Sequence, residues 1–230
     1  MLYSLFNTLG LVAATAYMYC MLPKYEIKRL RGMLFFGFTY VTIYALMLLL
    51  HWLMTGETEG QNIIRTFVFE PFIVWYYAKV FDLKSESCMD LAAVASCISI
   101  AFAKIGCAFA GCCESWLQVP WGLYNEYTNT RLFPVQIAES LTAFGVAILV
   151  HFMSKKHNYR NQGRCMPWML ILFCSTRVLW KFLKVDKKVF LCFSELALWN
   201  IAAVLLGAIW LIIDTLRKSK ERGGTKCMKF

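Results

Sequence analysis

Long apolar runs recur along the whole chain, and short polar segments separate them. Each run holds roughly 20 residues, which is enough for an α-helix to cross the ~30 Å hydrocarbon core of a membrane. The pattern therefore predicts an all-α polytopic membrane protein with about seven transmembrane helices. The predicted spans are residues 1–22, 33–54, 63–81, 90–111, 136–154, 165–183 and 196–216.

The connections between these spans are too short for a separately folded unit. The longest of them, residues 112–135, has room only for a short surface element. We therefore predict a single transmembrane domain over residues 1–230, which ends in a basic tail at residues 217–230.

Composition agrees with this picture and narrows the possible partners. Charged residues make up 17% of the chain, whereas soluble domains average about 25%. The formal net charge of +10 would suggest a nucleic-acid partner in a soluble protein. Here the Lys and Arg residues gather in short loops between apolar runs, which is the pattern of membrane orientation. We therefore expect no nucleic-acid partner.

The distribution of Lys and Arg between the loops predicts the orientation, because these residues are enriched on the cytoplasmic side. Residues 23–32 and 155–164 each carry four of them and the tail from Arg217 carries six, whereas residues 55–62 carry none. This places the N-terminus outside and the C-terminus in the cytoplasm. Three lysines of the sixth loop break the rule: Lys184, Lys187 and Lys188. We interpret them as attracting anionic phospholipid to the outer surface.

Three charged residues lie deep within predicted spans. Lys104, Glu139 and Arg177 come from three different spans, and the predicted topology gives them a similar depth in the outer half of the membrane. A charge at this depth is costly unless it is paired or hydrated, so such residues mark functional sites. Two cations and a carboxylate that converge would suit an anionic lipid headgroup and an acid–base step. A purely structural ion network is the alternative.

The other charges within the spans have simpler interpretations. Arg65 and Lys181 lie near span ends, where long side chains reach the membrane surface. Glu70 follows Arg65 by about one helical turn and would pair with it, and Asp214 lies near an inner end.

The segment "FAKIGCAFAGCCES" (residues 102–115) adds three cysteines to this region: Cys107, Cys112 and Cys113. Their spacing lacks the two ligand pairs of a structural zinc site and the C-x-x-C of a redox pair. A disulfide between the adjacent Cys112 and Cys113 would be strained. Gly106 and Gly111 instead indicate a tight turn where the backbone approaches a ligand. We therefore expect packing and turn roles for these thiols and no metal site.

The same residues carry a resemblance to a known family. The stretches "DLAAVASCISIAFAKIGCAFAGCC" (90–113) and "RLFPVQIAES" (131–140) resemble the bacterial prolipoprotein diacylglyceryl transferases. Further on, "STRVLWKFLKVD" (175–186) and "SELAL" (194–198) are similar to later motifs of that family. The resemblance covers most of residues 85–215.

The resemblance implies transfer of a diacylglyceryl group from phosphatidylglycerol to the lipobox cysteine of a prolipoprotein signal peptide, at the bacterial inner membrane. It implies no cofactor. The family's signature arginine falls on Lys104 and a later one on Arg177, so with Glu139 these are the expected catalytic residues. The expected substrate-binding residues are Gln136, Gly106, Gly111, Cys107 and Glu70.

The chain departs from the family's motifs at several positions. A glutamate and a second arginine of the family fall on Lys181 and Lys184, and the histidine of its third span has no counterpart in residues 67–77. Glu70 is the nearest polar residue there, and His51 is a second candidate. Two other functions therefore stay open: a non-catalytic lipid- or partner-binding protein of the same fold, and a membrane thiol oxidoreductase that uses Cys107 with Cys112 or Cys113.

Overall fold

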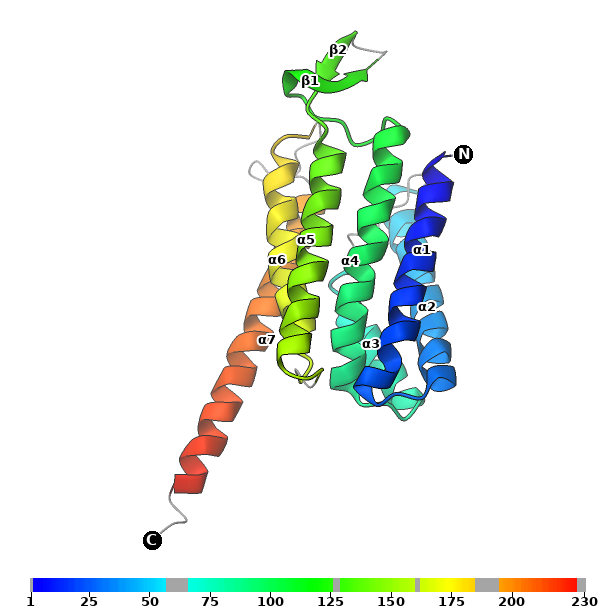
Figure 1. Ribbon diagram of the computed structural model, residues 1–230. Coiled ribbons are helices and arrows are strands. Elements are labelled where there is room, and N and C mark those ends of the chain that lie inside the picture. The colour runs from blue at the N-terminus through cyan, green and yellow to red at the C-terminus, as the bar shows by residue number, and fades with distance from the viewer. Residues whose placement is uncertain (1, 57–65, 126–128, 160–161, 185–194, 227–230) are drawn as a thin grey trace.

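The chain forms a bundle of helices with a small β-hairpin at one end (Figure 1). The computed structural model describes residues 2–56, 66–125, 129–159, 162–184 and 195–226. The elements are α1 (Leu2–Met21), a 3₁₀ helix (Leu22–Tyr25), α2 (Arg29–Thr55), α3 (Glu70–Val80), α4 (Ser85–Phe109), β1 (Gln118–Asn125), β2 (Thr130–Leu132), α5 (Val135–Lys156), α6 (Cys165–Lys181) and α7 (Glu195–Lys226).

The helices confirm a polytopic, predominantly α-helical membrane protein. Within the described residues, five are long and apolar enough to cross a membrane: those that begin at Leu2, Arg29, Ser85, Val135 and Glu195. The predicted third and sixth spans are shorter than expected. Helix α6 has 17 residues, close to the usual lower limit for a span. Helix α3 has 11, which at 1.5 Å per residue covers only about 16 Å.

Helix α4 forms the centre of the bundle and packs against α1, α3, α5 and α6. Its buried face is rich in small side chains such as Ala93, Ala95 and Ala101, which let neighbouring helices approach closely. On the α1 side the two helices approach closely at Gly10, where an added Cβ would lie 2.8 Å from the Ser99 carbonyl oxygen. This packing fixes the position of the outer end of α4 relative to its neighbours.

The long connection between α4 and α5 holds the two strands of the described residues. Strands β1 and β2 pair antiparallel, and a bulge in β1 lets both Gln118 and Leu123 oppose Leu132. Gly122 lies in this bulge, where a Cβ would fall 2.2 Å from the Leu132 carbonyl oxygen. The hairpin lies at the same end of the bundle as the N-terminus (Figure 1).

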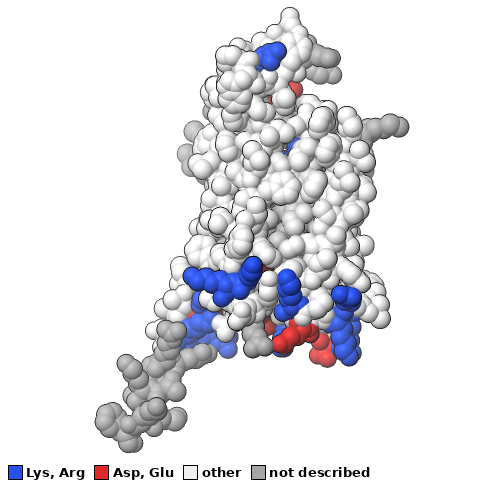
Figure 2. All heavy atoms as spheres, in the orientation of Figure 1, with Lys and Arg blue, Asp and Glu red and all other residues white. Residues whose placement is uncertain are grey.

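Charge is distributed unevenly along the bundle. Figure 2 shows that, on the viewed face, Lys and Arg gather at the end nearest the C-terminus, while the middle is almost uncharged. Helix α7 packs against α6 and continues beyond the bundle at this basic end (Figure 1). Arg164 and Lys218 both pair there with Asp214. The two termini lie at opposite ends, as an N-out, C-in orientation requires, although the sidedness itself stays a prediction.

The close approach of α1 and α4 gives a test of the packing. Gly10→Ala should lower the free energy of unfolding by about 1–3 kcal/mol, because the new methyl group meets α4 backbone that cannot move locally. Gly37→Ala in α2 is the matched control, since nothing lies within 4 Å of its added Cβ. Thermal unfolding of both variants in detergent would measure the difference. Equal melting temperatures would contradict the packing.

Candidate functional site

One carboxylate lies at the centre of the outer end of the bundle. Helix α5 starts at Val135, just after Pro134, and its second turn directs Glu139 into the interior, where the residue is 0% exposed. Its Oε2 atom lies 3.1 Å from Lys104 Nζ and 2.8 Å from Lys184 Nζ. Its Oε1 atom lies 3.5 Å from Arg177 Nη2. The structure thus brings together the three residues that the sequence predicted to converge.

The cations come from three different segments and are all buried. Lys104 lies near the end of α4, Arg177 lies in α6, and Lys184 follows α6. In the part of the chain that the structure describes, these three cations surround one carboxylate, which leaves a formal excess of two positive charges. Burying unbalanced charge is costly, so the group is suited to receive an anion.

Unpaired polar atoms also indicate an anion-binding site. Arg177 is 1% exposed, yet its Nε and Nη1 atoms have no hydrogen-bond partner within the described residues, and neither does Oε1 of Glu139. A buried donor without a partner costs roughly 1–3 kcal/mol. Oxygen atoms of a bound anion would satisfy the two free guanidinium donors.

Lys184 is the residue whose contact the sequence did not predict. It was expected to lie above the site and attract lipid, but its ammonium group bonds directly to Glu139. An isolated antiparallel bridge joins Ser115 to Lys184, and the Trp116 amide donates to the Leu183 carbonyl oxygen at 3.1 Å. These contacts hold the lysine in place. The sign of an unusual role in the sequence was that Lys184 lies on the predicted outer side, where Lys and Arg are normally rare.

Gln136 connects the ion group to the cysteine turn. The residue is buried, and its Nε2 atom donates to the Cys112 carbonyl oxygen at 2.7 Å. It therefore ties the start of α5 to the segment that follows α4. The turn itself depends on Gly111, whose φ of +64° favours glycine.

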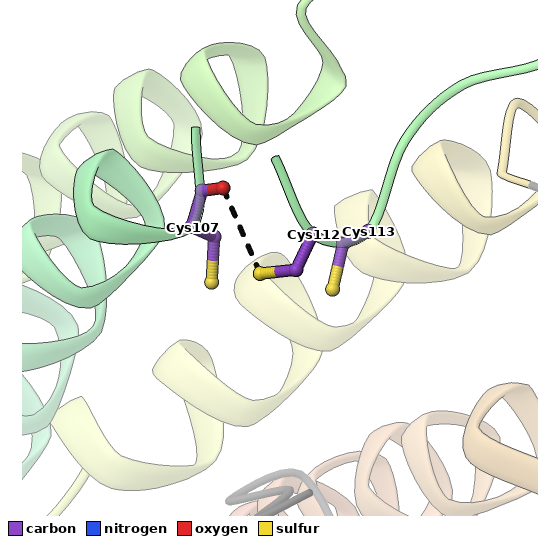
Figure 3. A group of neighbouring side chains, drawn as sticks. All are labelled: Cys107, Cys112 and Cys113. Carbon is purple, nitrogen blue, oxygen red and sulfur yellow. Dashed lines mark hydrogen bonds between the residues drawn. The ribbon is translucent and has the colours of Figure 1, made fainter. Parts of the chain in front are cut away.

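Gly106 and Cys107 occupy the last turn of α4. An added Cβ at Gly106 would lie 3.1 Å from Phe6 Cβ and 3.2 Å from the Tyr3 carbonyl oxygen, so this glycine lets α1 approach. Cys107 is buried, and its sulfur lies within 4.8 Å of those of Cys112 and Cys113 (Figure 3).

Glu70 lies apart from the ion group. It is buried and accepts a hydrogen bond from the Ser96 hydroxyl, eight residues before Lys104 on α4. Its surroundings are an apolar cavity of about 60 Å³ between α1, α2, α3 and α4. The expected partner Arg65 lies outside the described residues, as do Lys187 and Lys188. His51, the second candidate for the absent histidine, is buried near the end of α2.

Two comparisons with known proteins agree with the resemblance in the sequence. The family model described as prolipoprotein diacylglyceryl transferase matches residues 1–213. A phosphatidylglycerol–prolipoprotein diacylglyceryl transferase from Clostridium tetani (strain Massachusetts / E88) is 25% identical over 152 residues. The match covers 63% of this chain and 60% of that protein, so it spans less than two thirds of the relative's length.

The burial of Lys184 leads to a pH-dependent stability. Desolvation lowers the pKa of its ammonium group from 10.5 to about 8; Lys104 and Arg177 act in the same direction, while Glu139 and Cys113 oppose them. At a pH between these two pKa values, Lys184 is protonated in the unfolded chain and deprotonated in the folded protein. The free energy of unfolding should therefore rise with pH across this window.

A variant isolates this contribution. Wild type should gain stability relative to Lys184→Met as the pH rises from about 8 to about 10.5, measured as thermal unfolding in detergent. Lys84→Met is the control, because Lys84 is an exposed lysine near the basic end. Parallel pH profiles for wild type and Lys184→Met would contradict the buried position of this lysine.

Proposed function

Because the chain belongs to the prolipoprotein diacylglyceryl transferase family, we propose that it transfers a diacylglyceryl group from phosphatidylglycerol to the cysteine thiol of a prolipoprotein. The family is one of multi-pass proteins of the bacterial inner membrane, and the five long apolar helices agree with that location. The two substrates are then a membrane phospholipid and the lipobox region of a signal peptide.

The unpaired donors of Arg177 carry this proposal. Phosphatidylglycerol bears one phosphodiester anion. As far as the described residues show, the group around Glu139 combines an excess of positive charge with two guanidinium donors that have no partner. The planar guanidinium suits two oxygen atoms of one phosphate, which a lysine cannot bind in the same way. Binding of the headgroup phosphate would therefore satisfy both the charge and the hydrogen bonds.

The reaction needs the same cations. The acceptor thiol loses its proton to the solvent, and its sulfur forms a bond to the terminal carbon of the diacylglyceryl group. The bond from that carbon to the phosphate oxygen breaks, and glycerol phosphate leaves with the electron pair. Negative charge grows on the departing phosphate, so fixed cations stabilise the transition state more than the ground state. Lys104, Arg177 and Lys184 supply this charge, and Glu139 holds them in position.

The remaining predicted residues support the site indirectly. Gln136 and Gly111 set the path of the chain beside the cations. The apolar cavity at Glu70 lies deeper along α4 and suits part of an acyl chain. The phospholipid would thus place its headgroup at the outer end and its chains toward the membrane interior.

A non-catalytic lipid-binding role is the second candidate. One observation favours it: within the described residues, the Glu139 carboxylate pairs with three cations, so this group is a weak proton acceptor. Such a protein would bind phosphatidylglycerol and never release glycerol phosphate.

A transfer assay separates these functions. Purified protein in detergent would be mixed with phosphatidylglycerol and a lipobox peptide, and glycerol phosphate release would be measured. Arg177→Gln should lower the rate by about 100-fold or more, as loss of a transition-state donor does. Arg177→Lys keeps the charge and should retain part of the activity.

Two controls complete this test. Arg131→Gln changes an exposed arginine on β2 at the same end and should leave the rate unchanged. A peptide with serine in place of the lipobox cysteine should give no release. Full activity in Arg177→Gln would rule out the proposed phosphate site, and lipid binding without release by wild type would favour the non-catalytic role.

A further inference from the structure

Three cysteine side chains meet beside the ion group. Cys107 lies in the last turn of α4, and Cys112 and Cys113 follow in the next turn (Figure 3). All three sulfur atoms lie within 4.8 Å of one another. The Cys112 thiol donates to the Cys107 carbonyl oxygen at 3.6 Å. All three are free thiols. A zinc–sulfur bond of about 2.3 Å places tetrahedral sulfur ligands ~3.8 Å apart, so only a small contraction is needed.

The backbone at Cys113 is unusual for a residue with a side chain. Its φ is +62°, a conformation that glycine or asparagine normally occupies. Gly111, two residues earlier, also has a positive φ, and together they fold the chain back over the end of α4. This turn directs the Cys113 sulfur toward the other two. A thiol kept at a strained position suggests that the side chain has a function.

Two cations of the ion group lie near the thiols. Cys107 interacts electrostatically with Lys104, and Cys113 interacts with both Lys104 and Lys184. Nearby cations stabilise thiolates, and thiolates are the soft ligands that zinc prefers. Gln136 fixes the turn through the Cys112 carbonyl oxygen. Cys107 is buried whereas Cys113 is exposed, so one side of the group is open.

We propose that Cys107, Cys112 and Cys113 form a three-thiolate Zn²⁺ site whose fourth, open position binds the thiol of the acceptor peptide; this inference rests on the proposed function. The cysteine spacing predicted no metal site here, because it lacks the two ligand pairs of a closed structural site. Three protein ligands and one open position are instead the arrangement of catalytic zinc.

The site would activate the acceptor. A thiol that coordinates zinc loses its proton, which leaves to water on the exposed side. The resulting thiolate forms the bond to the glycerol carbon, and the electron pair of the broken carbon–oxygen bond departs with glycerol phosphate. Zinc with four thiolates carries a formal charge of −2, which Lys104 and Lys184 offset.

Such a site would also supply what the ion group lacks. The chain has three histidines, His51, His151 and His157. His151 bonds to the Tyr17 hydroxyl, and His157 follows the end of α5 farthest from Glu139, so neither of these two is placed to act on the ion group. Metal coordination generates the thiolate without a general base.

Metal binding is tested first, with the full-length protein in detergent. The protein would be treated with a phosphine reductant, stripped with a chelator, and titrated with Zn²⁺ and then with Co²⁺ as the spectroscopic probe. We expect one ion per chain and a thiolate-to-cobalt charge-transfer band. Cys107→Ser, Cys112→Ser and Cys113→Ser should each weaken binding at least about tenfold, because each removes a ligand.

Cys97→Ser is the matched control, because Cys97 is a buried cysteine of the same helix that lies outside the group. It should keep the affinity of wild type. Absence of Zn²⁺ or Co²⁺ binding by wild type, equal affinity in the three cysteine variants, or a disulfide within the group seen by mass spectrometry would each overturn the proposal.

The open position is tested with peptides. A lipobox peptide should change the cobalt spectrum by adding a fourth thiolate, whereas its serine analogue should not. An identical response to both peptides would overturn the role of the open position. Transfer by fully stripped protein would uphold the proposed function and overturn the zinc site, whereas metal and peptide binding without any transfer would uphold the zinc site and exclude the transferase function.

Discussion

A carboxylate buried among three cations is the interaction on which the outer end of this bundle depends. Glu139 joins α4, α6 and the segment after α6 to α5. Without its charge, Lys104, Arg177 and Lys184 would repel one another in a region that water hardly reaches. Breaking a buried pair typically costs about 3–5 kcal/mol, so this one residue both stabilises the helices and concentrates positive charge.

The segment between α4 and α5 forms part of the boundary of the site around these charges. The Ser115–Lys184 bridge and the Trp116 contacts with Phe182 and Leu183 hold the end of α6 against the base of the hairpin. Gln136 holds the cysteine turn from the other side. The segment after α4 and the segment after α6, far apart in the sequence, therefore line the same side of the site. The hairpin lies next to them.

The sequence predicted those features whose absence would cost much free energy in a membrane. Apolar runs must form helices in a membrane, and a charge such as Arg177 must find a partner there, so the convergence on Glu139 was foreseeable. The contact of Lys184 was not, because it depends on how a loop returns to Ser115. The meeting of the three sulfur atoms depends on a positive φ at Cys113, which spacing alone does not reveal. The short length of α3 could not be predicted, because apolar content does not mark where a helix starts.

Lys184 belongs to two groups at once, since it bonds to Glu139 and interacts with Cys113. Any ligand that draws on its charge therefore changes the electrostatic free energy of the other group. Thermodynamic linkage makes this effect reciprocal: an anion on the cations and an anionic metal–thiolate group would each weaken the binding of the other by the same factor. Transfer needs both occupants at once, so their mutual repulsion would be relieved when glycerol phosphate departs.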